Sequence, residues 1–265
     1  MAATLVFDIE TVPDVAGYRS VFELDPAIAD ADVAEIAFQR RRAASGQEFL
    51  PLHLQRVVAI ACLLRERDSL RIWSLGAPGD AEGELIQRFY DGIERYSPQL
   101  VSWNGGGFDL PVLHYRGLVH GVRAPRYWEM GEGDYGDSRD FRYNNYINRY
   151  HTRHLDLMDL LSLYQPRASA PLDQIARLLG LPGKVGMDGS QVWEAFRAGR
   201  LADIRAYCEA DVLNTWLVYL RFQLMRGALD QGAHGRETAL ARETIARLDG
   251  AHWREFLARW PEAPR

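Results

Sequence analysis

Cysteine is scarce in this sequence. Only Cys62 and Cys208 occur among 265 residues, and neither belongs to a paired ligand spacing. A disulfide framework or a zinc site needs several cysteines or histidines at suitable spacings, so the sequence favours neither. Long apolar runs are also missing, and the first residues show no basic segment followed by an apolar one. We therefore expect a protein that does not enter a membrane and that works in the reducing cytoplasm.

An excess of positive charge is missing too, because the formal net charge is −5. This balance argues against a protein that binds nucleic acid purely through many cationic phosphate contacts. It does not exclude a nuclease, since acidic metal ligands add to the negative count. Hydrophobic residues make up 47% and charged residues 25% of the chain, which is typical of a globular protein with a sizeable core. The length suits one α/β domain with additions.

Periodicity and turn residues predict the order of elements along the chain. They predict a strand at 4–9, an insertion at about 14–54 with a helix at 27–42, a strand pair at 57–64 and 70–75, a helix at 81–96, a strand at 100–103 and a helix opened by Phe108. After an irregular stretch to about 154, helices are predicted at 156–164, 171–179, 190–198 and 201–225, with an amphipathic stretch at 239–260. This order predicts an α/β fold of ribonuclease H-like type, a mixed sheet flanked by helices. We expect residues 1–226 to form this domain and 227–265 to form a helical tail.

Two acids stand at the end of the first predicted strand. Asp8 and Glu10 are two residues apart, so their side chains point to the same face of a strand. Paired carboxylates at the buried end of a sheet are costly unless a cation compensates them, and hard divalent metal ions prefer oxygen ligands. The pair is therefore compatible with a metal site, although an exposed strand end is the simpler interpretation of this motif by itself.

Two further motifs carry an acid on a helix. Asp109 follows a run of three glycines at the start of a helix, where the helix dipole alone also favours an acid. Tyr207 and Asp211 are four residues apart and share one helix face, as they would on any amphipathic helix. Asp211, however, precedes the strongly apolar run 212–220, where a charge needs a partner.

Together these segments resemble the DEDD superfamily of 3′-5′ exonucleases and its tyrosine-containing branch. The sequence is most similar to predicted exonucleases related to the exonuclease domain of family B DNA polymerases. Phe-Asp-Ile-Glu-Thr at 7–11 resembles the first exonuclease motif, 104–109 the second and 207–211 the third. The likeness extends to 154–159 and 183–189, and it spans 4 to about 222.

The resemblance implies a two-metal-ion 3′-5′ exonuclease that shortens single-stranded DNA or RNA ends and releases nucleoside monophosphates. Asp8, Glu10 and Asp211 would hold one Mg²⁺ or Mn²⁺ ion, Asp8 would bridge to a second, and Asp109 would bind largely through water. Tyr207 would orient the attacking water.

Six residues are candidates for binding the substrate. They are Thr11, Asn104, Phe108, Arg142, Tyr146 and Lys184. The last three lie in segments where the sequence leaves two readings open. Arginines alternate with aromatic residues in 139–154, which suits a single-strand channel but also a surface hairpin. The glycine-rich loop around Lys184 could meet a phosphate or could merely join two helices. Asp156 and Asp159 are expected to cap and line a helix start.

Two alternative functions remain open from the sequence. A haloacid-dehalogenase-like or other metal-dependent phosphatase also begins with a strand that ends in two acids, but the former expects aspartate at the second position, where Glu10 stands. A catalytically silent nucleic-acid-binding module would share the fold, but such relatives typically lose acids, and all four are present.

Overall fold

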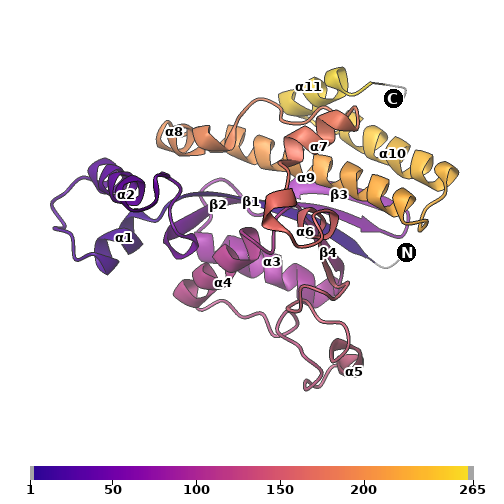
Figure 1. Ribbon diagram of the computed structural model, residues 1–265, viewed down its shortest axis with the longest axis horizontal. Coiled ribbons are helices and arrows are strands. Elements are labelled where there is room, and N and C mark those ends of the chain that lie inside the picture. The colour runs from indigo at the N-terminus through magenta and orange to yellow at the C-terminus, as the bar shows by residue number, and fades with distance from the viewer. Residues whose placement is uncertain (1–2, 262–265) are drawn as a thin grey trace.

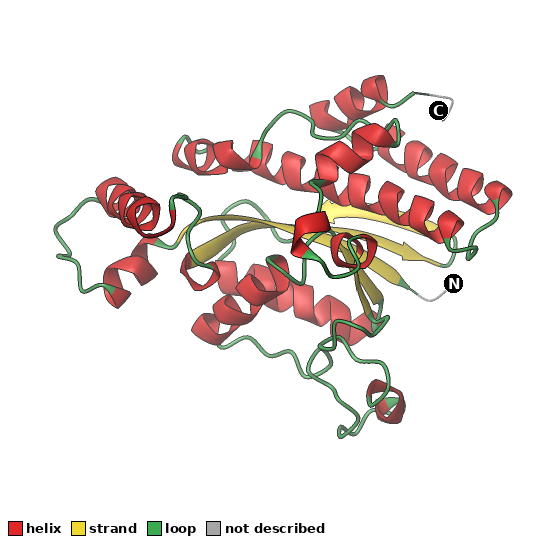
Figure 2. Cartoon of the chain, viewed as in Figure 1, coloured by secondary structure: helices red, strands yellow, loops and turns green. Residues whose placement is uncertain are grey.

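The computed structural model describes residues 3–261 and shows a five-stranded mixed sheet between two groups of helices (Figures 1 and 2). The strands are β1 (Thr4–Pro13), β2 (Gln55–Glu66), β3 (Ser69–Ser74), β4 (Gln99–Ser102) and β5 (His154–Asp156). Their order is β3-β2-β1-β4-β5, in which β1 runs antiparallel to β2 and parallel to β4. The predicted α/β architecture with a ribonuclease H-like mixed sheet is confirmed.

Helices cover both faces of this sheet (Figure 2). The α-helices are α1 (Val15–Val21), α2 (Asp30–Ser45), α3 (Glu82–Tyr96), α4 (Asp109–His120), α5 (Ser138–Phe141), α6 (Leu157–Leu161), α7 (Leu172–Leu178), α8 (Val192–Arg197), α9 (Leu201–Met225), α10 (Gln231–Ala246) and α11 (Ala251–Arg259). Short 3₁₀ turns are η1 (Leu52–Leu54), η2 (Pro166–Ala168) and η3 (Gly189–Gln191). In Figure 1, α3 and α4 lie below the sheet and α9 to α11 lie above it.

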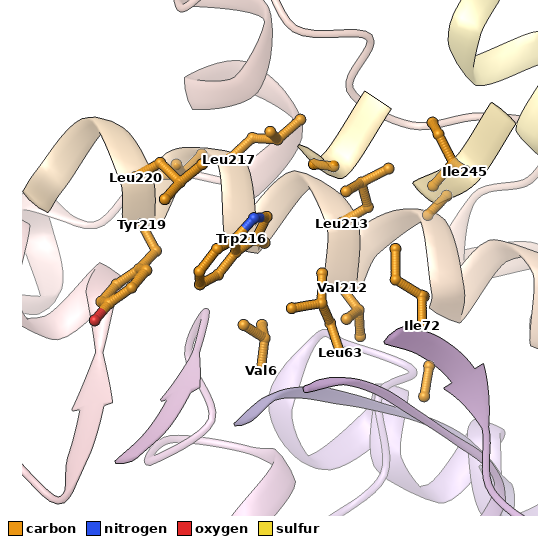
Figure 3. Packing of buried hydrophobic residues seen from close by; sticks show 14 of the residues in the cluster. Val6, Leu63, Ile72, Val212, Leu213, Trp216, Leu217, Tyr219, Leu220 and Ile245 are labelled. Carbon is orange, nitrogen blue, oxygen red and sulfur yellow. The ribbon is translucent and has the colours of Figure 1, made fainter. Parts of the chain in front are cut away.

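The side chains of β1 point alternately to the two faces of the sheet, and each face has its own half of the hydrophobic core. Phe7 and its neighbours on that side pack with α3 and α4, whereas Val6 packs with Trp216 and other residues of α9. Figure 3 shows this second half, where Val6, Leu63 and Ile72 face the apolar side chains of α9. Because side chains of a strand alternate, Asp8 and Glu10 follow Val6 onto the face that α9 covers. Because the apolar side chains of β1 are buried, the alternation of the strand also fixes the directions in which Asp8 and Glu10 point.

The insertion forms a lobe at the far end of a long β-ribbon. β1 continues beyond the predicted 4–9 and stays paired with β2 as far as Pro13 and Gln55. Beyond this end, α1 and α2 pack around their own small core, at the left of Figure 1. The sequence did not reveal α1, and the helix predicted at 27–42 is observed as α2.

The prediction for the segment around 154–156 was wrong, because it assigned irregular chain followed by helix. His154–Asp156 instead forms β5, parallel to β4 at the sheet edge, and the helix starts at Leu157. Three residues that are buried on both sides show no alternation of polar and apolar side chains, so no strand pattern was visible.

The C-terminal helices pack on the domain. Ile245 of α10 and Trp253 of α11 are buried in the same half of the core as α9. Arg65 of β2 makes two hydrogen bonds, both of 2.7 Å, to the carboxylate of Glu237 on α10. Among the described residues, no helix is both long enough and apolar enough to cross a bilayer.

Candidate active site

Asp8 and Glu10 on β1 lie beside the N-terminus of α4. The backbone N–H of Ile9, between the two acids, donates a 3.0 Å hydrogen bond to Oδ1 of Asp109, the first residue of α4. The register of β1 against β2 shifts between Glu10 and Thr11, which makes a bulge next to the acids. Such bulges often adjust the direction of side chains near functional sites. Two elements thus bring three carboxylates together.

A tight turn between β4 and α4 positions Asp109 beside Asp8 and Glu10. Asn104 adopts a left-handed conformation with φ of 64°, and a Cβ on Gly105 would lie 2.3 Å from Oγ of Ser102. The carboxylate of Asp156, at the end of β5, accepts N–H groups of Asn104 and Gly106, both at 2.9 Å. Asp156 also caps α6, as predicted. Its contacts with the turn make it a positioning residue, and this role was not visible in the sequence.

Helix α9 crosses β1 and contributes the remaining groups. Sγ of Cys208 lies 3.3 Å from the backbone oxygen of Asp8 and 3.4 Å from its Oδ2. One turn of helix separates Tyr207 from Asp211, and the Tyr207 hydroxyl is close enough to the Asp211 carboxylate to lower its pKa. Gly189 approaches this hydroxyl so closely that a Cβ there would be 3.9 Å away. Cys208 was missed by sequence reasoning, because one thiol in a helix carries no spacing signal.

The carboxylates of the acidic cluster are buried close together, and their negative charges repel one another. Burial, together with the charges of the other acids, raises the pKa of Asp8 and of Glu10 well above the usual range. Burial also raises the pKa of Asp109 to about 7, although the hydrogen bond from Ile9 opposes the shift. The pKa of Asp211 rises to about 7 for the same reason, against the effect of the Tyr207 hydroxyl. A cation would relieve this repulsion.

Lys184 brings one cation close to the acids. It is the only lysine of the sequence. Its Nζ makes a 2.6 Å ion pair with Asp188 and lies 6.0 Å from the centre of the Tyr207 ring. The ammonium group lowers the pKa of Glu10 and of Asp211, but burial outweighs its effect. A single ammonium therefore leaves most of the acidic charge uncompensated.

The donor set fits a hard divalent ion. Ligand atoms of Asp8, Glu10 and Cys208 lie within 4.8 Å of one another. Burial raises the pKa of the Cys208 thiol, which stays protonated and donates to Asp8. A protonated thiol is a poor ligand, whereas carboxylate oxygens suit Mg²⁺ and Mn²⁺. We therefore regard the carboxylates as the candidate ligands and Cys208 as a support for Asp8.

The predicted substrate residues fall into two groups. Thr11 follows Glu10 on β1, Asn104 lies in the turn, and Phe108 precedes Asp109, so these three border the acids, as does Lys184. Phe108 also contacts Phe49 of the insertion, with ring centres 5.5 Å apart.

Tyr146 and Arg142 are not brought to the acids by any described contact. Tyr146 is buried in the core on the α3 side, stacks on Tyr127 and donates to the backbone oxygen of Pro98 at 2.6 Å. Its ring is therefore not free to stack on a base. Arg142 is exposed, and its guanidinium lies 3.5 Å from the backbone oxygen of Gly131.

A family model matches residues 47–260, and its description is a predicted 3′-5′ exonuclease related to the exonuclease domain of PolB. The chain belongs to this family. Asp109, Tyr207 and Asp211 lie within the matched span, whereas Asp8 and Glu10 precede it. In the fold these two acids nevertheless meet Asp109 and helix α9, because β1 passes beneath α9 and beside α4. No curated protein matches the chain. Membership in an exonuclease family supports nuclease activity, and the acidic cluster is its candidate active site.

Proposed function

We propose that the protein is a metal-dependent 3′-5′ exonuclease that removes nucleoside monophosphates from single-stranded ends of DNA or RNA. The observation that carries this proposal is the convergence of Asp8, Glu10, Asp109 and Asp211 from three separate elements onto one site beside Tyr207. Neither alternative function has a comparable observation in its favour. The two buried cysteines suit a reducing compartment, and we place the activity in the cytoplasm.

Asp8, Glu10 and Asp211 would hold one Mg²⁺ or Mn²⁺ ion, and Asp8 and Asp109 would hold a second. Such a pair, when bound, stabilises charge on the attacking and the leaving oxygen of a phosphodiester. The Cys208 thiol and the Ile9 N–H each bind one carboxylate, so Asp8 and Asp109 are held in place before a metal arrives. This preorganisation limits the reordering that binding would otherwise require.

Tyr207 would orient the attacking water. Burial raises the pKa of its hydroxyl, so the group remains a neutral hydrogen-bond donor and acceptor at physiological pH. The hydroxyl lies beside the carboxylate of Asp211, which is one of the proposed metal ligands. Lys184 would approach the non-bridging oxygens of the phosphate, and Thr11, Asn104 and Phe108 would contact the terminal nucleotides.

Digestion of 5′-labelled single-stranded DNA and RNA tests the proposal. We expect a ladder that shortens from the 3′ end with Mg²⁺ or Mn²⁺, and no ladder with chelator. Asp8→Ala removes a ligand and should abolish the ladder, whereas Asp203→Ala, an exposed acid in the first turn of α9, should not. Products of unchanged length with the wild type under every metal condition would contradict the proposed function.

A further inference from the structure

The loop of residues 184–189 lies between two pockets beside the acidic cluster. Gly186 borders a pocket of about 590 Å³ on one side, and Gly189 borders a pocket of about 560 Å³ on the other. A Cβ on Gly186, where φ is 79°, would meet no described atom within 4 Å. The middle of this loop is therefore not fixed by close packing, and its polar contacts decide where its side chains lie.

Hydrogen bonds fix the main chain where the loop begins. The side-chain amide of Asn214 donates to the backbone oxygen of Gly183 at 2.8 Å. The carboxylate of Asp173 accepts the backbone N–H of Lys184 at 2.7 Å. Neither contact involves the lysine side chain. The flexible four-carbon stem of Lys184 therefore needs a partner of its own before its ammonium group has one defined position.

Asp188 is that partner, at the other end of the loop. Its Oδ2 accepts a hydrogen bond of 2.6 Å from Nζ of Lys184. Its Oδ1 accepts the backbone N–H of Ser190 at 3.0 Å, and the Asp188 N–H donates to Oε1 of Gln191 at 3.0 Å, which completes a capping box for η3. One carboxylate oxygen thus binds the start of η3 and the other binds the ammonium group. An ammonium group has three donors, so two remain for a phosphate.

The negative charge of Asp188 is unfavourable for a phosphate at this site. It lies near enough to the acidic cluster to raise the pKa of Glu10 and of Asp211. On charge alone, the site would attract a phosphate more strongly without Asp188. Its contact with Lys184 has the opposite effect, because it holds a cation close to the acids. A substitution that removes the charge and keeps the helix cap separates the two effects.

We propose that Asp188 is a positioning residue of the exonuclease, which holds the ammonium group of Lys184 beside the acidic cluster so that the scissile phosphate meets a cation already in place. The inference rests on the proposed function and adds the group that orients its cation. A lysine side chain that is ordered before the substrate arrives loses less conformational entropy on binding. Asp188 acts through Lys184 and need not touch the phosphate.

Asp188→Asn tests the proposal, because asparagine also caps a helix but carries no charge. We expect kcat/KM to fall about 3- to 30-fold for the single-stranded substrate that the wild type shortens. In a Lys184→Met background the same substitution should change kcat/KM by less than about 2-fold, since the cation that it positions is already gone. Glu243→Gln removes the charge of an exposed acid that pairs with Arg247 on α10, and this matched control should keep the wild-type value.

Two kinetic results would overturn the proposal. A kcat/KM of Asp188→Asn equal to or above that of the wild type would mean that the charge of Asp188, and not its hold on Lys184, decides the rate. An equal loss in the Lys184→Met background would assign Asp188 to the cap of η3 alone.

The order of the lysine side chain can be measured without turnover. Lys184 is the only lysine of the sequence, so protein labelled with ¹³C-lysine gives one Cε signal in NMR spectra. In chelator we expect the order parameter of this methylene group to fall by about half in Asp188→Asn and to stay unchanged in Glu243→Gln. Equal order parameters in wild type and Asp188→Asn would overturn the proposal even if the wild type is a nuclease. A fall in a protein that hydrolyses no nucleic acid would retain the hold of Asp188 on Lys184 and contradict the exonuclease function.

Discussion

In the absence of metal, ionisation of the buried Asp211 carboxyl group lowers the free energy of unfolding. Its folded-state pKa of about 7 lies above the value near 4 of an unfolded aspartate, so the folded state binds the proton more tightly. The free energy of unfolding therefore contains a favourable contribution below about pH 4, which is lost as the pH rises through about 7.

Asp211→Asn should consequently stabilise the metal-free protein at high pH while it removes activity. In chelator we expect the gain to be larger at pH 8 than at pH 5 by roughly 2 kcal/mol, seen as a rise in melting temperature that is several degrees greater at pH 8. Thermal unfolding at the two pH values measures it. Equal or lower stability of the variant at pH 8 would show that burial does not destabilise the ionised Asp211 carboxylate.

Tyr207→Phe removes only the hydroxyl beside Asp211. If that hydroxyl orients the water, kcat should fall roughly 10- to 100-fold, while KM and the metal concentration for half-maximal rate change little. Steady-state kinetics over a Mn²⁺ titration separate these quantities. A rate equal to that of the wild type would remove the water-orienting role from Tyr207.

At the scale of elements, the turn from β4 to α4 depends on the absence of a side chain at Gly105. A Cβ there would lie 2.3 Å from Oγ and 2.5 Å from Cβ of Ser102, which is buried and cannot move away. We expect Gly105→Ala to lower the free energy of unfolding by roughly 1–3 kcal/mol and to reduce activity, because the turn positions Asp109.

Gly92→Ala is the matched control for this prediction. Gly92 lies inside α3, where an added Cβ meets nothing within 4 Å. Alanine in a helix should raise stability by about 0.5–1 kcal/mol. Denaturant unfolding of both variants gives the comparison, and similar behaviour of the two would mean that the Ser102 contact does not constrain the turn.

The sequence predicted the parts of the site that local spacing encodes. Two residues on a strand, or four on a helix, share a face whatever the fold, so the pairing of Asp8 with Glu10 and of Tyr207 with Asp211 was readable. The order of elements predicted the mixed sheet, because strands and helices of ordinary length carry clear periodicity.

Contacts between distant segments were not readable in the same way. Asp156 binds the turn at Asn104 only because β5 lies beside β4, and β5 is too short to show a pattern. Cys208 meets Asp8 across 200 residues of chain. The burial of Tyr146 likewise depends on packing against Tyr127, which alternating arginines and aromatics in the sequence do not reveal.

At the scale of the whole molecule, the C-terminal helices are held by a buried ion pair. Arg65 and Glu237 are both almost fully buried and join β2 to α10. Glu237→Ala would leave the Arg65 guanidinium buried without its partner, and we expect a loss of about 3–5 kcal/mol in the free energy of unfolding.

The double variant Arg65→Met with Glu237→Leu removes both charges and should recover most of that loss. Chemical denaturation of the single and double variants measures the difference. A single variant as stable as the wild type would mean that α10 contributes little to the domain, and that the segment from residue 227 behaves as a separate tail.

Lys184 is the only lysine of the sequence, so the chain has a single site for a lysine-specific protease. A lysine-specific protease can cut this chain only after Lys184, in the glycine-rich loop before η3, and the cut places Asp8, Glu10 and Asp109 on one fragment and Tyr207 and Asp211 on the other. Since α9 is buried against β1 and β2, we expect the two fragments to remain associated and to separate only in denaturant. Gel filtration after limited digestion tests this, with immediate dissociation as the contrary result. The nuclease would then be a two-piece enzyme whose halves each lack activity and regain it on reassembly.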